Sequence, residues 1–260
     1  MKTRLDKLLV ERGLVPTRER AQALILAGRV LVHEQKYDKP GTSVVSDAPI
    51  RLLGSDLRYV SRGGLKLEAA LAQWSINLTG RFCLDIGAST GGFTDCMLQH
   101  GAARVLAIDT GYGQIAQSLR DDPRVTLMER TNARLLTPGD LPPGISFLAV
   151  DVSFISATLV LPPVIAAVRH ASDTPPLEAV ILIKPQFEAG REHVGKGGIV
   201  RDPAAHQLAI DRVRGCVSDI GASSIEVIDS PITGTEGNRE FLLHALWRQN
   251  RLPSRGTLRA

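Results

Sequence analysis

The sequence predicts an α/β protein with a doubly wound sheet, preceded by a small α+β module. From about residue 80 onwards, continuous apolar runs alternate with helix-type segments, and such runs suit strands that helices bury on both faces. Residues 1–62 carry twelve Lys and Arg against seven Asp and Glu, whereas the other 198 residues carry 19 basic and 20 acidic side chains. A basic small module beside a neutral larger one indicates an appendage that binds a polyanion.

Composition excludes several classes of protein. The 260 residues are 43% apolar and 22% charged, which is ordinary for a globular chain and excludes a disordered, collagen-like or coiled-coil protein. Aromatic residues make up only 4%, which argues against an aromatic surface for stacking single-stranded nucleic acid. Three scattered cysteines, Cys83, Cys96 and Cys216, provide neither a disulfide framework nor a zinc site. We therefore expect a reducing cytoplasm and no metal.

The chain shows no sign of a targeting or membrane segment. The charged start Met1–Lys7 is followed by no signal-peptide apolar region. The longest uncharged stretch, 152–168, has 17 residues and contains Pro162 and Pro163, whereas a membrane helix needs about 20 mostly apolar residues. We expect the end of a strand and the start of a helix there.

The basic module predicts two helices and several short strands. Leu5, Leu8 and Leu9 have helical spacing, with Thr3 as the expected N-cap and Gly13 as the stop. A second helix is expected over 17–27, and Gly28 suits the left-handed position after it. A strand over 29–32, a turn over 33–36 and further short strands to residue 53 follow.

This stretch of about 60 residues resembles the S-four-like RNA-binding domain. The resemblance rests on the runs Arg4–Leu9 and Thr17–Ala21 and on Leu24-Ile25-x-x-Gly28-x-Val30-x-Val32. Where the family has Asn-Gly after the first strand, this chain has 33–35 His-Glu-Gln. The resemblance implies recognition of structured RNA by shape and backbone. The side chains expected to contact RNA phosphates are Arg4, Lys7, Arg18, Arg20, Arg29 and Arg62.

The larger part predicts a series of strands at short intervals. A helix is expected over 93–100, and residues 249–260 have the character of a frayed tail. The expected strands are 81–86, 104–109, 125–128, 145–151, 179–184, 224–228 and 240–247.

A glycine-rich turn, 85–94 (Asp-Ile-Gly-Ala-Ser-Thr-Gly-Gly-Phe-Thr), follows the first of these strands. It does not fit a dinucleotide fingerprint, because Ser89 occupies the second glycine position. It departs from a P-loop, because Phe93 replaces the lysine that contacts phosphates. The remaining interpretations are an S-adenosylmethionine site and a turn that serves only helix–strand packing.

Two carboxylates favour the S-adenosylmethionine site. Asp85 and Asp109 stand 24 residues apart at the ends of consecutive expected strands. A carboxylate accepts two hydroxyl donors at once, which suits a ribose. Ligands of open α/β sheets bind at the carboxyl edge, where these side chains are expected. We therefore interpret the larger domain as a methyltransferase.

The sequence excludes some of the possible target atoms for methylation. Amino-group methyltransferases carry Asn/Asp-Pro-Pro-Tyr/Phe after the fourth strand, whereas this chain has Asp151-Val152-Ser153-Phe154. None of the three cysteines follows a proline, as a nucleophile for carbon-5 methylation often does, and packing roles are expected for them. A ribose 2′-hydroxyl remains, and a partly desolvated lysine near a second cation can activate it. Lys184 and Asp151, at the ends of apolar runs, are the best candidates, with ordinary strand-end charges as the alternative.

Across nearly its whole length the chain resembles the TlyA family of haemolysin/rRNA methyltransferases. In that family an S-four-like domain precedes an FtsJ-like, Rossmann-like methyltransferase domain. Beside the glycine-rich turn, the matching motifs are Tyr59–Leu67, Asp151–Ser156, Lys184–Glu188, Gly197–Asp202 and Gly237–Glu240.

The resemblance implies a cytidine 2′-O-methyltransferase that uses S-adenosyl-L-methionine and acts on ribosomal RNA or ribosomal subunits. The family's Lys-Asp-Lys-Glu tetrad falls on Lys66, Asp151, Lys184 and Glu240, with Glu236 as a rival for the last position. The residues expected at the cofactor are Asp85, Gly87, Ala88, Ser89, Thr90, Gly91, Gly92, Phe93, Asp109, Asn132 and Asp151.

Several points stay open at this level. The segment 196–198 (Lys-Gly-Gly) is either a mobile loop over the site or a plain turn. A ribosome-binding assembly factor with an inactive methyltransferase fold and a membrane-active haemolysin are the alternative functions. The expected domains are 1–60 and 61–250 with a tail over 251–260, and the oligomeric state is not indicated.

Overall fold

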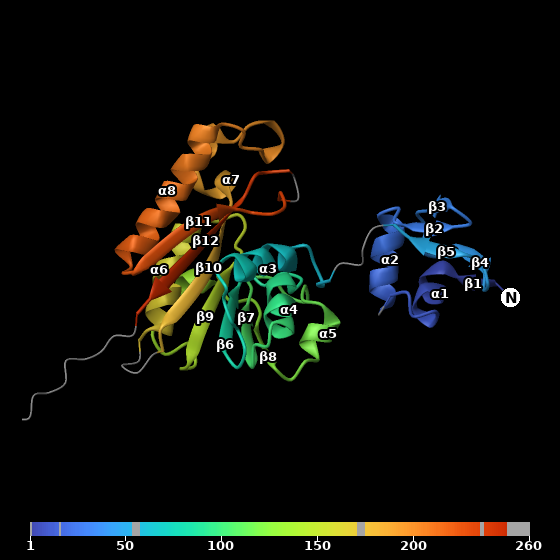
Figure 1. Cartoon of the computed structure of the whole chain (residues 1–260), viewed down its shortest axis with the longest axis horizontal. Coiled ribbons are helices and arrows are strands. Elements are labelled where there is room, and N and C mark those ends of the chain that lie inside the picture. The colour runs from blue at the N-terminus through green and yellow to red at the C-terminus, as the bar shows by residue number, and fades with distance from the viewer. Residues whose placement is uncertain (1, 16, 54–57, 171–174, 235–236, 249–260) are drawn as a thin grey trace, which may run out of the picture. The chain divides into compact units, whose positions relative to one another are not determined.

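The computed structural model describes residues 2–15, 17–53, 58–170, 175–234 and 237–248, and it divides into two compact units, Met1–Arg58 and Tyr59–Ala260. Figure 1 shows both units, which are described separately below. No helix within the described ranges is both long and apolar enough to cross a membrane. The uncharged stretch 152–168 forms a loop and then a helix; the helix was expected, but the preceding strand ends earlier, at Val150.

The smaller unit packs two helices and short antiparallel strands around an apolar core. Its helices are α1 (Leu5–Glu11) and α2 (Arg18–Leu26), and its strands are β1 (Lys2–Arg4), β2 (Val30–Val32), β3 (Gln35–Tyr37), β4 (Ser43–Val45) and β5 (Ile50–Leu52). In the described residues β3-β2-β5 form one sheet and β1-β4 another. The predicted helix-forming leucines, Leu5, Leu8 and Leu9, are buried in this core.

Two details of this unit correct the sequence-based expectations. Thr3 is not an N-cap: it lies in β1, where its Oγ1 is 3.0 Å from Ser46 Oγ, and α1 begins without a side-chain cap. Lys36 belongs to β3, so the turn is shorter than expected. His33 and Glu34, with φ of 50° and 62°, form a left-handed turn, which fits the twist of a tight hairpin. Thr17 is the N-cap of α2, where its side chain accepts a hydrogen bond from the Arg20 amide.

The larger unit is built, in its described residues, on a seven-stranded sheet with the order β11-β12-β10-β9-β6-β7-β8. All its pairs are parallel except those that β12 forms with β10 and β11. The strands are β6 (Phe82–Ile86), β7 (Arg104–Ile108), β8 (Val125–Met128), β9 (Ile145–Val150), β10 (Leu177–Ile183), β11 (Ser224–Asp229) and β12 (Phe241–Trp247).

Helices cover both faces of this sheet (Figure 1). Leu148 and Val150 of β9 pack in the core under α6 and α8, whereas Phe147 and Ala149 pack in the core under α3 and α4. This alternation is why the central strands carry apolar residues on both faces, with few exceptions such as Asp85 in β6. The helical segments are α3 (Gly63–Gln73), α4 (Gly92–Gln99), α5 (Gln117–Arg120), η1 (Ala133–Leu135), α6 (Ala157–Val168), α7 (Pro185–Glu188), η2 (Arg191–His193), η3 (Lys196–Gly198) and α8 (Pro203–Asp219).

The sheet places the predicted functional residues along one edge. Asp109, Asp151 and Lys184 directly follow β7, β9 and β10, and the carboxyl ends of parallel strands meet at the same edge. Because β12 runs antiparallel to β10, with Phe241 opposite Ile183, its amino end lies at that edge as well. Glu240, just before β12, therefore comes next to Lys184 in register.

The contact of α3 with α4 gives a first prediction. A Cβ added at Gly92 would lie 2.1 Å from Ser61 Oγ and 3.0 Å from the Gly64 amide nitrogen. We expect Gly92→Ala to lower the free energy of unfolding by about 2 kcal/mol, because the helices must separate. Urea unfolding followed by circular dichroism measures this change.

Gly215→Ala in the exposed part of α8 is the matched control. Nothing lies within 4 Å of a Cβ added there, so alanine should stabilise the helix by about 0.5–1 kcal/mol. Equal effects of the two substitutions would contradict the role assigned to Gly92.

Candidate active site

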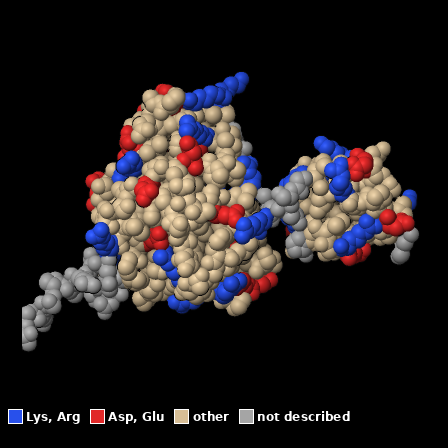
Figure 2. All heavy atoms as spheres, viewed as in Figure 1, with Lys and Arg blue, Asp and Glu red and all other residues tan. Residues whose placement is uncertain are grey.

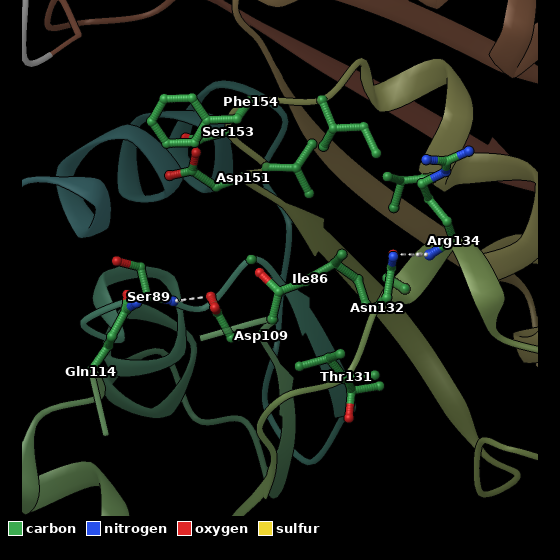
Figure 3. Close-up of a pocket in the computed structure, with 17 residues that line it drawn as sticks. Ile86, Ser89, Asp109, Gln114, Thr131, Asn132, Arg134, Asp151, Ser153 and Phe154 are labelled. Carbon is green, nitrogen blue, oxygen red and sulfur yellow. Dashed lines mark hydrogen bonds between the residues drawn. The ribbon is translucent and has the colours of Figure 1, made fainter. Parts of the chain in front are cut away.

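A cavity of about 430 Å³ opens at the carboxyl edge of the sheet. Its wall is formed by the turn after β6, the ends of β7 and β9, and the loop after β8 (Figure 3). The residues predicted at the cofactor that line this cavity are Gly87, Ser89, Asp109, Asn132 and Asp151.

Asp109 is fixed by the backbone. Its two carboxylate oxygens accept hydrogen bonds from the Ser89 amide at 2.8 Å and the Gly111 amide at 2.6 Å. Figure 3 shows the bond from Ser89 beside the cavity. Each oxygen has a second lone pair, so the carboxylate can still accept bonds from two neighbouring hydroxyl groups in the cavity.

Gly87 has a steric reason to be glycine. Its φ is +84°, and an added Cβ would lie 2.4 Å from the carbonyl oxygen of Asp151. The turn after β6 therefore contacts the backbone after β9 directly, a close approach that only glycine permits. This contact holds together two parts of the cavity wall, the turn after β6 and the segment after β9.

The rest of the glycine-rich turn serves other contacts. Ala88 lines a small adjacent cavity with Ser89 and Asp109. Gly91 begins α4 in a left-handed conformation, where an added Cβ would meet Leu119. Thr90, Gly92 and Phe93 likewise do not line the cavities described here, and Phe93 is buried in the core under α3 and α4.

Asp85 lies beneath the turn rather than at the cavity wall. It is fully buried within β6, and its Oδ2 accepts a 2.6 Å hydrogen bond from Thr94 Oγ1. Burial, aided by the nearby negative charges of Asp151 and Asp109, raises the pKa of Asp85 to about 7. Its Oδ1 has no hydrogen-bond partner among the described residues. The structure thus does not bring Asp85 together with Asp109 at the cavity.

Four predicted catalytic residues form two buried ion pairs. Lys184 Nζ lies 2.6 Å from Asp151 Oδ1 and 2.7 Å from Ser153 Oγ. Lys66 Nζ lies 2.5 Å from Glu240 Oε2. The two lysines and Glu240 are less than 10% exposed, whereas the Asp151 side chain is 22% exposed, so the three buried charges are balanced by their partners rather than by water. The rival residue, Glu236, lies outside the described residues.

A second cavity, of about 330 Å³, adjoins the first. Lys184, Glu240, Gln186 and other residues line it, and it shares Ser153 and Phe154 with the larger cavity. A group in one cavity can therefore approach a group in the other beside the Lys184–Asp151 pair.

Phe154 was not singled out by the sequence, although it follows Asp151 in a quoted motif. Its side chain is 92% exposed, and its φ of 64° is unusual for a bulky residue. The ring lies 5.5 Å from the ring of Phe187, in a tilted arrangement. Such strain occurs mainly at functional sites, and Figure 3 shows the ring at the end of the cavity near Asp151.

Asn238 was also missed as an individual residue. It is 1% exposed, its Nδ2 donates to the Gly198 carbonyl at 2.8 Å, and its Oδ1 accepts from the Val200 amide at 2.9 Å. The Val200 carbonyl is 2.9 Å from His206 Nε2. The sequence left open whether 196–198 is a mobile loop or a plain turn. In the structure, Asn238 bonds to the end of this segment at Gly198 and to Val200 just after it, and so holds both next to the residues that precede β12.

The predicted RNA-contacting residues lie in both units. In the smaller unit Lys7 is exposed, Arg20 is half-buried, and Arg29 Nε donates to the Leu53 carbonyl at 2.8 Å. Arg4 and Arg18 both bond to Asp6. Arg62 belongs to the larger unit, where its Nη2 donates to the Thr233 carbonyl at 2.8 Å.

The cysteines occupy packing positions. Cys83 and Cys96 are fully buried, and Cys216 is half-buried. Burial raises the pKa of Cys83 to about 12 and also raises that of Cys216. Neither thiol is activated as a nucleophile.

Comparison with known proteins places this site in a family. Residues 59–246 match the model of the FtsJ-like methyltransferases. The chain belongs to that family. Residues 3–48 match the S4 domain, so this family member carries an S4 domain before its methyltransferase domain, which confirms the resemblance inferred from sequence.

Several relatives match this chain over most of its length. A Bacillus subtilis protein named "Putative rRNA methyltransferase YqxC" is 50% identical over 247 residues, covering 95% of this chain and 86% of that protein. The "16S/23S rRNA (cytidine-2'-O)-methyltransferase TlyA" of Mycobacterium tuberculosis is 43% identical, covering 93% and 89%. A solved Streptococcus thermophilus structure titled "Putative hemolysin" has 42% identity and a TM-score of 0.73, covering 98% and 92%.

The buried Asp85 carboxyl gives a prediction about pH. Its pKa is raised to about 7 in the folded protein from an ordinary value of 3.8. Between these values the folded state binds more protons than the unfolded state, so this group makes stability fall as pH rises. We expect Asp85→Asn to lose less stability than the unaltered chain between pH 5 and pH 8, by on the order of 2 kcal/mol.

Urea unfolding of both proteins at the two pH values measures the difference. A parallel loss of stability in the two proteins would show that Asp85 does not titrate in this range.

Proposed function

We propose that the protein is an S-adenosylmethionine-dependent rRNA 2′-O-methyltransferase of the TlyA type, which methylates a cytidine ribose. The observation that carries the proposal is the Lys184–Asp151 ion pair at the junction of two adjoining cavities. The larger cavity suits the methyl donor and the smaller one suits the target nucleoside. The activity in the name of the 43% identical Mycobacterium tuberculosis protein supports the same reaction.

The residues of the larger cavity suit S-adenosylmethionine. The Asp109 carboxylate, held by two backbone amides, accepts the two ribose hydroxyls of the donor. Gly87 lines this cavity and packs its turn against the backbone of Asp151, and Asn132 lines the wall where the adenine would lie. When bound, S-adenosylmethionine supplies an electrophilic methyl group on its sulfonium.

In the proposed mechanism, the protein orients the nucleophile and removes its proton. Lys184 Nζ, after releasing its ion-pair proton to solvent, would receive the proton of the ribose 2′-hydroxyl. A bound S-adenosylmethionine would supply the methyl group, which would pass to the 2′-oxygen as its bond to sulfur breaks and S-adenosylhomocysteine leaves. Asp151 and Ser153 hold that amine at 2.6 and 2.7 Å. Glu240, held by Lys66, lines the smaller cavity together with Lys184, and most of the rate comes from positioning.

RNA reaches this site through both parts of the chain. We propose that the S4 domain docks on ribosomal RNA through its basic side chains and that Arg62 extends the contact onto the methyltransferase domain. The target nucleotide then leaves its stack to enter the smaller cavity, where Phe154 and Phe187 offer aromatic faces. We place this reaction in the cytoplasm, where ribosomes are found.

Paired substitutions separate chemistry from cofactor binding. We expect Lys184→Ala to reduce methyl transfer by at least about 100-fold while S-adenosylmethionine still binds, because only the proton acceptor is lost. We expect Asp109→Ala to weaken S-adenosylmethionine binding and leave RNA binding unchanged. Transfer of labelled methyl to ribosomal subunits and naked rRNA, with calorimetry of cofactor binding, measures both.

The product and the control decide between outcomes. The label should map to a ribose rather than a base. Transfer retained by Lys184→Ala would exclude the lysine mechanism, and no transfer to any subunit by the unaltered chain would favour an assembly factor instead of an enzyme.

The fastening of the 198–200 segment gives a further prediction. In Asn238→Asp the donor to the Gly198 carbonyl is replaced by an oxygen that repels it. We expect the KM for RNA to rise about tenfold or kcat to fall by a similar factor, with S-adenosylmethionine affinity unchanged. Steady-state methyl-transfer kinetics measure the effect.

Asn77→Asp provides the control, because Asn77 is exposed and bonds only locally, to the Thr79 amide. If both substitutions leave the kinetics unchanged, the 198–200 segment has no part in holding the substrate.

A further inference from the structure

Asp6 is a completely buried carboxylate in the S4 domain, and three side chains converge on it. Arg4 donates to both of its oxygens, from Nε at 3.1 Å and from Nη2 at 2.9 Å. Arg18 Nε and Gln22 Nε2 each donate to Oδ2 at 3.0 Å. The positive charges and hydrogen bonds lower the pKa of Asp6 well below its usual range, so it stays ionised at neutral pH.

The shared oxygen brings two guanidinium groups together. Because Arg4 Nη2 and Arg18 Nε bond to the same Asp6 oxygen, these nitrogens lie within about 6 Å of each other. The two arginines come from different elements, since Arg4 ends β1 and Arg18 begins α2. The buried carboxylate therefore fixes both the separation and the orientation of groups that would otherwise be flexible.

Both arginines keep donors for another partner. A guanidinium has five N–H donors; within the described residues Arg4 Nη1 and both terminal nitrogens of Arg18 make no hydrogen bond. Each of these side chains is 45% exposed, while Asp6 is 0% exposed. Asp6 carries one negative charge and the two arginines carry one positive charge each, so the cluster has a net charge of +1. This charge balances the single negative charge of one phosphodiester. Lys and Arg side chains are visible on this domain in Figure 2.

We propose that Arg4 and Arg18, fixed by Asp6, form a binding site for one phosphodiester group of the RNA backbone. Asp6 is the positioning residue of this site and does not itself touch RNA. The inference rests on the proposed function, since it assumes that the S4 domain binds RNA, and it adds the geometry by which it does so. Planar guanidinium forks held in advance bind a phosphate with less loss of side-chain entropy.

The proposal makes a prediction opposite to that of charge alone. Asp6→Asn removes a negative charge from an RNA-binding domain, so long-range electrostatics by itself would strengthen binding. If Asp6 instead fixes the arginines, the same substitution frees them and weakens binding. Glu11→Gln supplies the matched control, because Glu11 is exposed on α1, makes no bond among the described residues and carries the same charge.

The experiment measures binding of the full-length chain to naked ribosomal RNA over a range of salt concentrations. We expect Asp6→Asn to bind about tenfold more weakly than the unaltered chain, through loss of two pre-oriented contacts. We expect Glu11→Gln to bind equally or slightly more tightly. Arg18→Lys keeps the charge but lacks the planar fork in which Nε bonds Asp6 while the terminal nitrogens keep their donors, so it should lose a similar factor to Asp6→Asn.

Folding is checked separately by thermal unfolding, with binding measured well below the melting temperature of each variant. If Asp6→Asn does not fold, Arg18→Lys provides the test by itself. Binding of the folded Asp6→Asn or Arg18→Lys protein as tight as that of Glu11→Gln would overturn the proposed site. Failure of the unaltered chain to bind rRNA would instead overturn the proposed function.

Discussion

The antiparallel pairing of β12 with β10 decides which side chains can meet at the edge of the sheet. In a fully parallel sheet, the residue before a strand lies at the edge opposite to the residue after its neighbour. Here the reversed strand begins beside Ile183, where β10 ends, so Glu240 and Lys184 line the same cavity. The docking of α3 then brings Lys66 onto Glu240, across 174 positions of sequence.

The Lys66–Glu240 and Lys184–Asp151 ion pairs hold particular side chains in place but contribute little to the stability of the fold. Removing two charges from water costs several kcal/mol for each ion, which their attraction largely offsets, so a buried ion pair contributes little to folding. An apolar set of side chains would fill the same space at least as well. We infer that Lys66, Glu240, Lys184 and Asp151 are there for the chemistry of the site.

Strand-end residues were predictable from sequence because a strand and its end are local properties. Asp109, Asp151 and Lys184 each follow an apolar run, and the parallel sheet brings such ends together. That Lys66 pairs with Glu240 in particular was not predictable from the residues, because the pairing depends on how α3 packs. Asp85 ends the same kind of run, but its side chain points into the sheet's packing and bonds Thr94. Side chains along a strand point alternately to the two faces of the sheet. When both faces are apolar, the sequence does not show to which face the side chain at the end of a strand points.

Residues whose role depends on the conformation of the backbone could not be predicted from the sequence. Phe154 has a left-handed conformation, and no residue pattern around it in the sequence predicts that conformation. Asn238 fastens a distant segment, so its role exists only once Gly198 and Val200 are placed. Thr3 was misplaced because a polar residue before a helix also suits a short edge strand.

The division of the chain into two units has a consequence for how such proteins diversify. All four members of the two ion pairs lie in Tyr59–Ala260, whereas Asp6 and its arginines lie in Met1–Arg58. A mutation that retunes the attachment to one RNA fold therefore leaves the reacting groups untouched. Evolution can therefore change which RNA structure the first unit binds while the reacting groups of the second unit stay the same.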